Sequence, residues 1–375
     1  MPSHEPFALV DSTLREGEQF ATARFSSAQR LAIAEALDAF GVEYIELTSP
    51  AASPQSARDL AAIARHGLRA RILTHVRCHL DDARLAVEHG AQGVNLLYAT
   101  SEPLRRASHG RSLNQIVEEA ATVIGYLQQH DVEIRFSCED AFRTDLDDLL
   151  RVYRAVAALG VQRVGLADTV GVATPRQVYA TVARVRAAVA CDIEFHGHND
   201  SGCAVANAFC AYEAGATHLD VTVLGIGERN GIASLGGIVA RMASLDPALV
   251  ARYNLALLPE LDHMVAGIVG LPIPFDAPIS SPFAFHHKAG LHTRAVLNDP
   301  RSYEALDPAL FGRSRTVAVA HRLVGWHAVA ERARELGIYL SEAAARQAAA
   351  RIKALGDEHD LDGTTVDELI YEYAE

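Results

Sequence analysis

The residues with the clearest chemical potential form the stretch Glu194-Phe195-His196-Gly197-His198-Asn199-Asp200. The apolar residues before it predict a strand, on which residues two apart project to the same side. His196 and His198 then point the same way, and Gly197 leaves space between them. Two neutral imidazoles that converge on one point suit a divalent metal. The alternative is a pair of hydrogen-bonded histidines at a strand end.

A carboxylate that could complete this metal site ends the first apolar segment, Asp11-Ser12-Thr13-Leu14-Arg15-Glu16. Extended geometry predicts that Asp11, Thr13 and Arg15 share the inward face, with Glu16 capping the strand. Glu16 and the two histidines would provide three ligands and leave positions open for substrate and water. This donor set favours Mg²⁺ or Mn²⁺, with Co²⁺ and Zn²⁺ as alternatives.

Other apolar segments also end in polar residues. His75 follows one segment, Arg135, Ser137 and Glu139 alternate along another, and Thr169 follows a third. If these ends meet, a 2-oxo acid could chelate the metal through its keto oxygen and adjacent carboxylate. Arg15 could then stabilise negative charge on the keto oxygen. Arg135 and Ser137 could hold a second carboxylate, assisted by His75 and Thr169. The structural alternative is a network of salt bridges among these side chains that has no role in catalysis.

One further histidine lies far along the chain, in Lys288-Ala289-Gly290-Leu291-His292. We expect His292 to lie in an exposed turn beside a glycine. An imidazole titrates near neutral pH, so His292 could act as a general base together with an acid such as Glu139. A solvent-exposed histidine without a function is the alternative.

The elements that position these residues alternate between short apolar strands and longer helical patterns. Several of the helices end in a glycine before the next strand, at Gly41, Gly67, Gly90, Gly160 and Gly215. Eight strand-helix units predict a parallel TIM (β/α)₈ barrel, in which chemistry gathers at the carboxyl ends of the strands. A doubly wound open sheet is the competing fold, but the first strand lacks a glycine-rich turn. The predicted strands span residues 7–14, 44–48, 70–76, 93–98, 133–137, 163–167, 192–196 and 218–224.

After the barrel the pattern changes. A helix is expected over residues 257–270, followed by Pro272, Pro274, Pro278 and Pro282, which mark a linker. The predicted division is a catalytic barrel over residues 1–270, a linker subdomain over 271–320 and a mainly helical region over 321–375.

Composition limits the partners and the compartment. The 375 residues are 49% hydrophobic and carry a net charge of −13, which argues against nucleic-acid or anionic-membrane binding. The 5 cysteines show no Cys-x-x-Cys spacing and indicate reduced thiols. The sequence shows no signal peptide and no membrane-spanning run, so a cytoplasmic location is expected.

Three motifs resemble a known family. The residues 11–19, 196–200 and 225–231 are similar to signatures of the isopropylmalate/homocitrate synthase family of Claisen-condensing acyltransferases. The resemblance covers nearly the whole chain and is strongest to homocitrate synthases of the aminoadipate route to lysine. Isopropylmalate synthases carry a long regulatory domain beyond the point where this chain ends, and they tend to have Asn in place of Ile232.

The resemblance implies a metal-dependent condensation of acetyl-CoA with 2-oxoglutarate, giving homocitrate and CoA. It implies Glu16, His196 and His198 as metal ligands, Arg15 as the group that stabilises the oxyanion, and Glu139 with His292 as an acid/base pair. His292 would come from a partner subunit, with Tyr303 on the same surface, so a homodimer is implied, with assembly to a tetramer left open. L-lysine is the expected feedback inhibitor, with His75 as its contact.

Alternative functions remain open at this stage. The same reaction could serve nitrogenase cofactor assembly, and isopropylmalate or citramalate synthesis would use a similar site. A lyase of the hydroxymethylglutaryl-CoA type would need a reactive cysteine in a glycine-rich loop, and none of the cysteines lies in one. A non-catalytic binding barrel is the remaining alternative.

Overall fold

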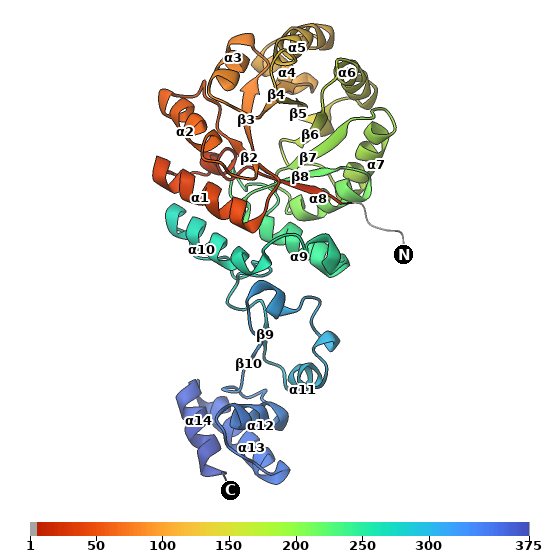
Figure 1. The fold of residues 1–375 in the computed structure, drawn as a ribbon. Helices are drawn as coiled ribbons and strands as arrows, with labels where there is room; N and C mark the ends of the chain where they lie inside the picture. Colours follow the sequence, from red (N-terminus) through yellow and green to blue (C-terminus); the bar gives the residue numbers. More distant parts are fainter. Residues whose placement is uncertain (1–5, 375) are drawn as a thin grey trace. The chain divides into compact units, whose positions relative to one another are not determined.

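The computed structural model describes residues 6–374 of the chain. Eight parallel strands pair in chain order and close into a barrel, because β8 also pairs with β1 (Figure 1). The fold predicted from the sequence is therefore confirmed. The strands are β1 (Ala8–Asp11), β2 (Tyr44–Leu47), β3 (Arg71–Arg77), β4 (Gly93–Ala99), β5 (Glu133–Glu139), β6 (Arg163–Asp168), β7 (Asp192–Gly197) and β8 (His218–Val221).

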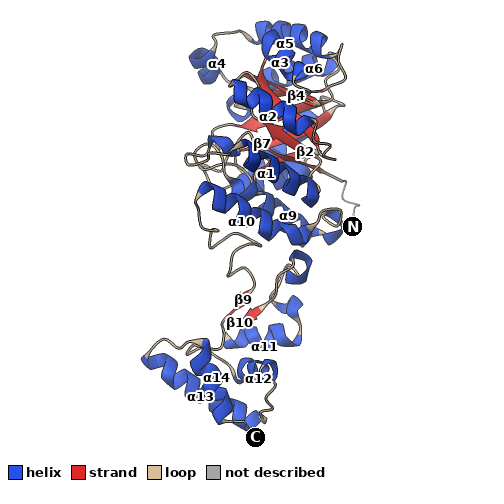
Figure 2. Cartoon of the chain, turned by 60° about the vertical axis from the view of Figure 1, so that its left-hand side comes forward, coloured by secondary structure: helices blue, strands red, loops and turns tan. Residues whose placement is uncertain are grey.

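Helices surround the strands of this first unit, as Figure 2 shows in blue around red. Each predicted glycine stop has a positive φ, for example 108° at Gly41 and 103° at Gly215, a conformation that side chains disfavour. The helices of this unit are α1 (Ser27–Phe40), α2 (Pro54–Ala64), α3 (Leu80–Glu88), α4 (Glu102–Ser108), α5 (Leu113–Leu127), α6 (Leu146–Ala158), α7 (Pro175–Arg186), α8 (Ala204–Glu213), α9 (Leu235–Leu245) and α10 (Leu258–Val269).

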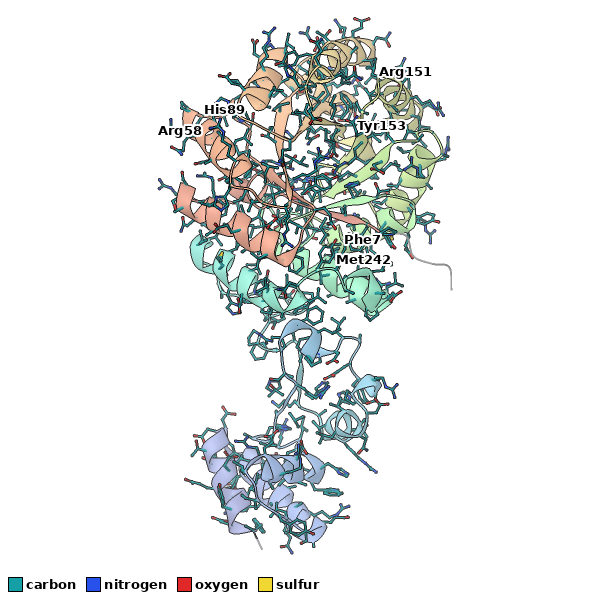
Figure 3. All side chains as sticks on the ribbon, viewed as in Figure 1. Phe7, Arg58, His89, Arg151, Tyr153 and Met242 are labelled. Atoms are coloured by element: carbon teal, nitrogen blue, oxygen red, sulfur yellow. The ribbon has the colours of Figure 1, made fainter. Side chains whose placement is uncertain are left out.

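An apolar layer between strands and helices stabilises the barrel. On α6 the side chain of Tyr153 is fully buried and its hydroxyl donates to the carbonyl of Gly165 at 2.5 Å, whereas Arg151 points outward (Figure 3). The outward side chains of the strands, such as Leu9, Ile45 and Phe195, are likewise buried beneath the helices. Burial of such apolar area is the main driving force for folding.

The inside of the barrel is charged instead of apolar. Arg163 lies between Glu133 and Glu194, and Arg135 contacts Glu194 and Glu46. Buried charges persist only when they are paired, and here each guanidinium faces carboxylates from neighbouring strands. These pairs fill the barrel below its carboxyl-terminal rim and support the side chains at the rim.

The first strand is shorter than predicted. It ends at Asp11, and residues 13–16 form a turn. Asp11 pairs in register with Ile45 and Val221, so it faces outward, while Ser12 reaches Glu46 and Asp220 inside. The prediction that Asp11, Thr13 and Arg15 share the inward face is wrong, because the alternation of an extended strand stops where the turn begins.

The chain divides into two compact units, Met1–Ser280 and Ser281–Glu375. The second unit contains the short strands β9 (His286–His287) and β10 (Thr316–Val317) and the helices α11 (Gly290–Asn298), α12 (Trp326–Glu335), α13 (Glu342–Glu358) and α14 (Gly363–Glu372). The last three helices share an apolar core that includes Val329, Ile352 and Ile370. Among the described residues, no helix combines the length and the apolar character needed to cross a membrane.

Candidate active site

The three predicted metal ligands meet at the carboxyl-terminal rim of the barrel. Glu16 comes from the turn after β1, His196 from β7, and His198 from the residue after β7. All three are buried, and their donor atoms lie within 4.8 Å of one another. Nε2 of His196 is 3.3 Å from Nε2 of His198, which in turn is 4.0 Å from Oε1 of Glu16.

This geometry fits a divalent ion. Two nitrogens bound to one ion at about 2.1 Å would be roughly 3.0–3.4 Å apart, which matches the separation of the two imidazoles. Nδ1 of His196 donates to Oδ2 of Asp220 at 2.7 Å, so its Nε2 is left as a lone-pair donor. Burial and the neighbouring His196 lower the pKa of His198 to about 4, so its imidazole is neutral at pH 7.

Glu16 is held in its ionised form. Its Oε1 accepts the backbone N–H of Glu228 at 2.8 Å, and its Oε2 is 2.6 Å from Nη1 of Arg15. Burial opposes ionisation, but the charge of the Arg15 guanidinium holds the pKa of Glu16 below its ordinary value. A buried carboxylate beside two imidazoles is a typical ligand set for a catalytic metal.

Arg15 is a buried guanidinium surrounded by carboxylates. Its Nε lies 2.7 Å from Glu46, and its Nη2 lies 3.6 Å from Asp220. Burial disfavours the charge, yet Glu46 and Glu16 raise the pKa of Arg15 further above its ordinary value. Arg15 therefore stays charged and rigid at the rim, where it can face an oxygen that gains negative charge.

Every site residue that the sequence predicted in the barrel lines one cavity of about 380 Å³. His75 and Arg135 lie on its wall together with Asn95, a residue that the sequence reasoning missed. The remaining lining residues are Arg15, Glu16, Gln19, Leu97, Ser137, Glu139, Ala167, Thr169, His196, His198, Glu228 and Arg229.

Two titratable groups that line this cavity have shifted pKa values. Burial and Arg15 lower the pKa of His75 to about 4, so His75 is neutral at pH 7, and its Nδ1 lies 3.2 Å from the amide nitrogen of Asn95. Burial, with Asp140 beside it, raises the pKa of Glu139 above its ordinary value, a direction that favours the protonated form of a carboxyl group assigned to proton transfer.

Two predicted substrate contacts are linked to each other. The guanidinium of Arg135 contacts Glu194, and its Nε donates to the hydroxyl of Ser137 at 2.9 Å. The hydroxyl of Ser137 in turn donates to the side-chain amide oxygen Oδ1 of Asn95 at 3.0 Å. Gly165 makes this arrangement fit, because a Cβ there would lie 2.1 Å from the Ser137 oxygen.

The residue that orients His196 was also missed. Asp220 lies on β8 two residues after His218, so both side chains point into the barrel. The same two-residue spacing that revealed the histidine pair on β7 could have revealed Asp220. In the sequence, the only recognised motif near this strand is the loop that follows it, residues 225–231.

The remaining predicted residue, His292, lies in the second unit. It belongs to helix α11 and not to a turn, so that part of the prediction is wrong. Its side chain is exposed, and its ring lies 4.3 Å from the ring of Tyr303. A role for His292 in the reaction stays a prediction.

A closed parallel barrel with a buried Glu/His/His group at its carboxyl-terminal rim defines a barrel enzyme with a site suited to a divalent metal. Residues 6–265 match the HMGL-like family model, and residues 279–360 match the model "Homocitrate synthase post-HMGL domain-like". The chain belongs to the HMGL-like family and, within it, to the homocitrate synthases.

Two relatives with known names support the assignment to the homocitrate synthases. The chain is 53% identical over 368 residues to the mitochondrial homocitrate synthase of Yarrowia lipolytica, covering 98% of this chain and 82% of that protein. It is 51% identical to the cytosolic isozyme of Saccharomyces cerevisiae, covering 97% of this chain and 85% of that protein.

A solved structure supports the fold. The HMG-CoA lyase of Bacillus subtilis superposes with a TM-score of 0.66 at 21% identity, covering 73% of this chain and 97% of that chain.

Proposed function

We propose that this protein condenses acetyl-CoA with 2-oxoglutarate and water to give homocitrate and CoA, the first step of the aminoadipate route to lysine. The observation that carries the proposal is one cavity in which a Glu/His/His group, Arg15 and a set of buried polar groups lie together. The kinship with homocitrate synthases supports the same assignment.

In this proposal Glu16, His196 and His198 hold a divalent ion, with Mg²⁺ or Mn²⁺ favoured and Co²⁺ or Zn²⁺ as alternatives. When bound, the ion supplies Lewis acidity toward the keto group of the substrate. Arg15 stabilises the negative charge that the keto oxygen gains as a carbon nucleophile adds to the keto carbon. Glu46 and Asp220 fix the orientation of Arg15 for this role.

Proton transfer is assigned to Glu139 and His292. A base removes a proton from the methyl group of acetyl-CoA, and the carbanion forms the new carbon–carbon bond. The thioester of the product is then hydrolysed by water, which releases CoA. The raised pKa of Glu139 supports its participation. His292 belongs to the second unit. We propose that it reaches this site from a partner subunit of a homodimer, as the family resemblance implies.

The polar wall of the cavity selects the keto acid. A dicarboxylic substrate needs donors for its second carboxylate, and we assign Arg135, Ser137, His75 and Thr169 to this role. A branched or short monocarboxylic substrate has no second carboxylate to bond these polar groups, so it would lose the interactions that 2-oxoglutarate makes with them. This favours 2-oxoglutarate over the substrates of isopropylmalate and citramalate synthesis. Use of homocitrate for the nitrogenase cofactor involves the same reaction.

Two further proposals concern regulation and location. L-lysine is expected to compete with 2-oxoglutarate, with neutral His75 as a contact. We propose the cytoplasm as the compartment, in line with the reduced cysteines; the relatives named above include a mitochondrial and a cytosolic enzyme.

The test is thiol release from acetyl-CoA with 2-oxoglutarate, 3-methyl-2-oxobutanoate and pyruvate, each with and without EDTA. We expect 2-oxoglutarate to give the highest kcat/KM and EDTA to abolish turnover until Mg²⁺ or Mn²⁺ is restored. A preference for either monocarboxylate, or full activity in EDTA, would overturn the proposal.

A further inference from the structure

The loop between β8 and α9 places one arginine across three loops of the rim. Nε of Arg229 donates to Oδ1 of Asp200 at 2.8 Å, and its Nη2 donates to Oδ2 of Asp200 at 2.9 Å and to the carbonyl of Thr169 at 2.7 Å. Arg229 follows β8, Asp200 follows β7 and Thr169 follows β6. We call these three groups the rim clamp.

The backbone at Arg229 is unusual for a residue with a side chain. Its φ is 55°, in the left-handed region, where glycine is the ordinary choice. Glycines occupy this region elsewhere in the same loop, at Gly225 and Gly231. An arginine that holds such a conformation is fixed by its contacts, and residues of this kind concentrate at functional sites.

The loop that Arg229 holds lies directly against a metal ligand. The backbone N–H of Glu228 donates to Oε1 of Glu16 at 2.8 Å. A Cβ at Gly227 would lie 2.7 Å from that same oxygen, so the loop packs on the carboxylate with no room to spare. A shift of the loop would therefore move or release Glu16.

The other end of the clamp reaches the proposed substrate contacts. The hydroxyl of Thr169 accepts the backbone N–H of Asp140 at 2.8 Å, so its own proton remains available to a ligand in the cavity. Asp140 directly follows Glu139 and also has a positive φ, of 58°. Arg229 holds the Thr169 carbonyl, which fixes the same residue from its other side.

We propose that Arg229 is a positioning residue: through the rim clamp it fixes both the Glu16 carboxylate for the divalent ion and the Thr169 hydroxyl for the keto acid. Arg229 contacts neither the ion nor the reacting atoms in this assignment. The part that concerns the keto acid rests on the function proposed above, whereas the part that concerns the ion does not.

The test compares Mn²⁺ binding to the full-length protein by electron paramagnetic resonance, without substrate. Arg229→Gly keeps the backbone conformation and removes the clamp. We expect Mn²⁺ to bind it about tenfold more weakly, as for other groups that support a metal ligand. Arg229→Lys should lose nearly as much, because one ammonium cannot bond both carboxylate oxygens and the Thr169 carbonyl in that geometry. Adding Asp200→Asn to Arg229→Gly should cause no further loss.

The matched control is Arg77→Ala, which removes another guanidinium–carboxylate pair, 2.7 and 2.9 Å from Asp82, between the last residue of β3 and helix α3, and Arg77 does not line the cavity. It should bind Mn²⁺ as the wild type does. Mn²⁺ affinity within twofold of wild type in Arg229→Gly, or an equal loss in Arg77→Ala, would overturn the clamp. If Arg229→Gly does not fold, Arg229→Lys decides by the same criterion. A raised KM for 2-oxoglutarate in Arg229→Lys, at saturating Mn²⁺, is the expected second readout. If the wild type does not condense 2-oxoglutarate, the proposed function fails while the Mn²⁺ titration still decides on the clamp.

Discussion

Replacing Asp220 by asparagine should weaken metal binding without unfolding the barrel. Asp220 is 1% exposed, so water does not screen its charge. Its carboxylate accepts hydrogen bonds from Nδ1 of His196, at 2.7 Å, and from the hydroxyl of Ser12. It also lies 3.6 Å from Nη2 of Arg15. Ser12 and Arg15 both have Glu46 as another partner, whereas Nδ1 of His196 has no second hydrogen-bond partner among residues 6–374. The loss in Asp220→Asn therefore falls on His196.

The magnitude follows from this single contact. Without the carboxylate the imidazole is less basic, and an amide N–H turned toward Nδ1 would favour the tautomer with its proton on Nε2, which cannot bind a metal. Loss of such a partner typically costs ten- to a hundredfold in metal affinity, or about 1.4–2.8 kcal/mol.

The assay is Mn²⁺ titration of the metal-free protein, with the melting temperature measured in parallel. Asp262→Asn is the matched control, because it makes the same chemical change at another buried carboxylate of the barrel unit. An Asp220→Asn protein that is folded and binds Mn²⁺ within twofold of wild type would refute this account of His196.

Three further predictions concern other parts of the molecule. Gly165→Ala should displace Ser137 and raise the KM for 2-oxoglutarate about tenfold, with unchanged Mn²⁺ affinity. Gly125→Ala is the control, because a Cβ there meets nothing within 4 Å, and it should change neither the KM nor the Mn²⁺ affinity. Equal kinetics for both variants would contradict the packing argument. Burial raises the pKa of Asp262 from an ordinary 3.8 to about 6, so its ionised form destabilises the fold above pH 6 and the cost disappears as the pH falls below 4. Asp262→Asn should therefore raise the free energy of unfolding by up to about 3 kcal/mol at pH 8 and by little at pH 4, and a gain that does not depend on pH would be evidence against this. Lysine should raise the apparent KM for 2-oxoglutarate in the wild type and not in His75→Leu; inhibition that persists in the variant would remove His75 from the lysine contact.

Much of the fold followed from the sequence because its signals are local. Glycine at the helix ends and apolar runs of five to eight residues located all eight strands, and only their ends moved by a few residues. The error at Asp11 has the same origin, since nothing in the residues themselves marks the point where an extended segment turns. His292 was placed in a turn because Gly290 precedes it, but that glycine begins the helix.

The site was less predictable where it depends on contacts between residues far apart in the sequence. Glu16, His196 and His198 could be grouped because each closes a segment that had to end at one rim. Asp220, Asn95 and Glu46 were missed because their importance lies in the side chains that they contact on the neighbouring strand or loop, His196, His75 and Arg15, which lie 20 or more residues away in the sequence. The tight approach of Gly227 to Glu16 is likewise visible only in three dimensions.

The central claim is that Glu16, His196 and His198 bind one divalent ion that a keto dicarboxylate can share. A crystal of the full chain grown with Mn²⁺ and 2-oxoglutarate, with anomalous data collected at the manganese edge, tests it most directly. We expect one anomalous peak about 2.0–2.3 Å from Oε1 of Glu16 and Nε2 of both histidines, with the keto acid in contact with it. A peak elsewhere, or three side chains that surround no ion at saturating Mn²⁺, would contradict the claim.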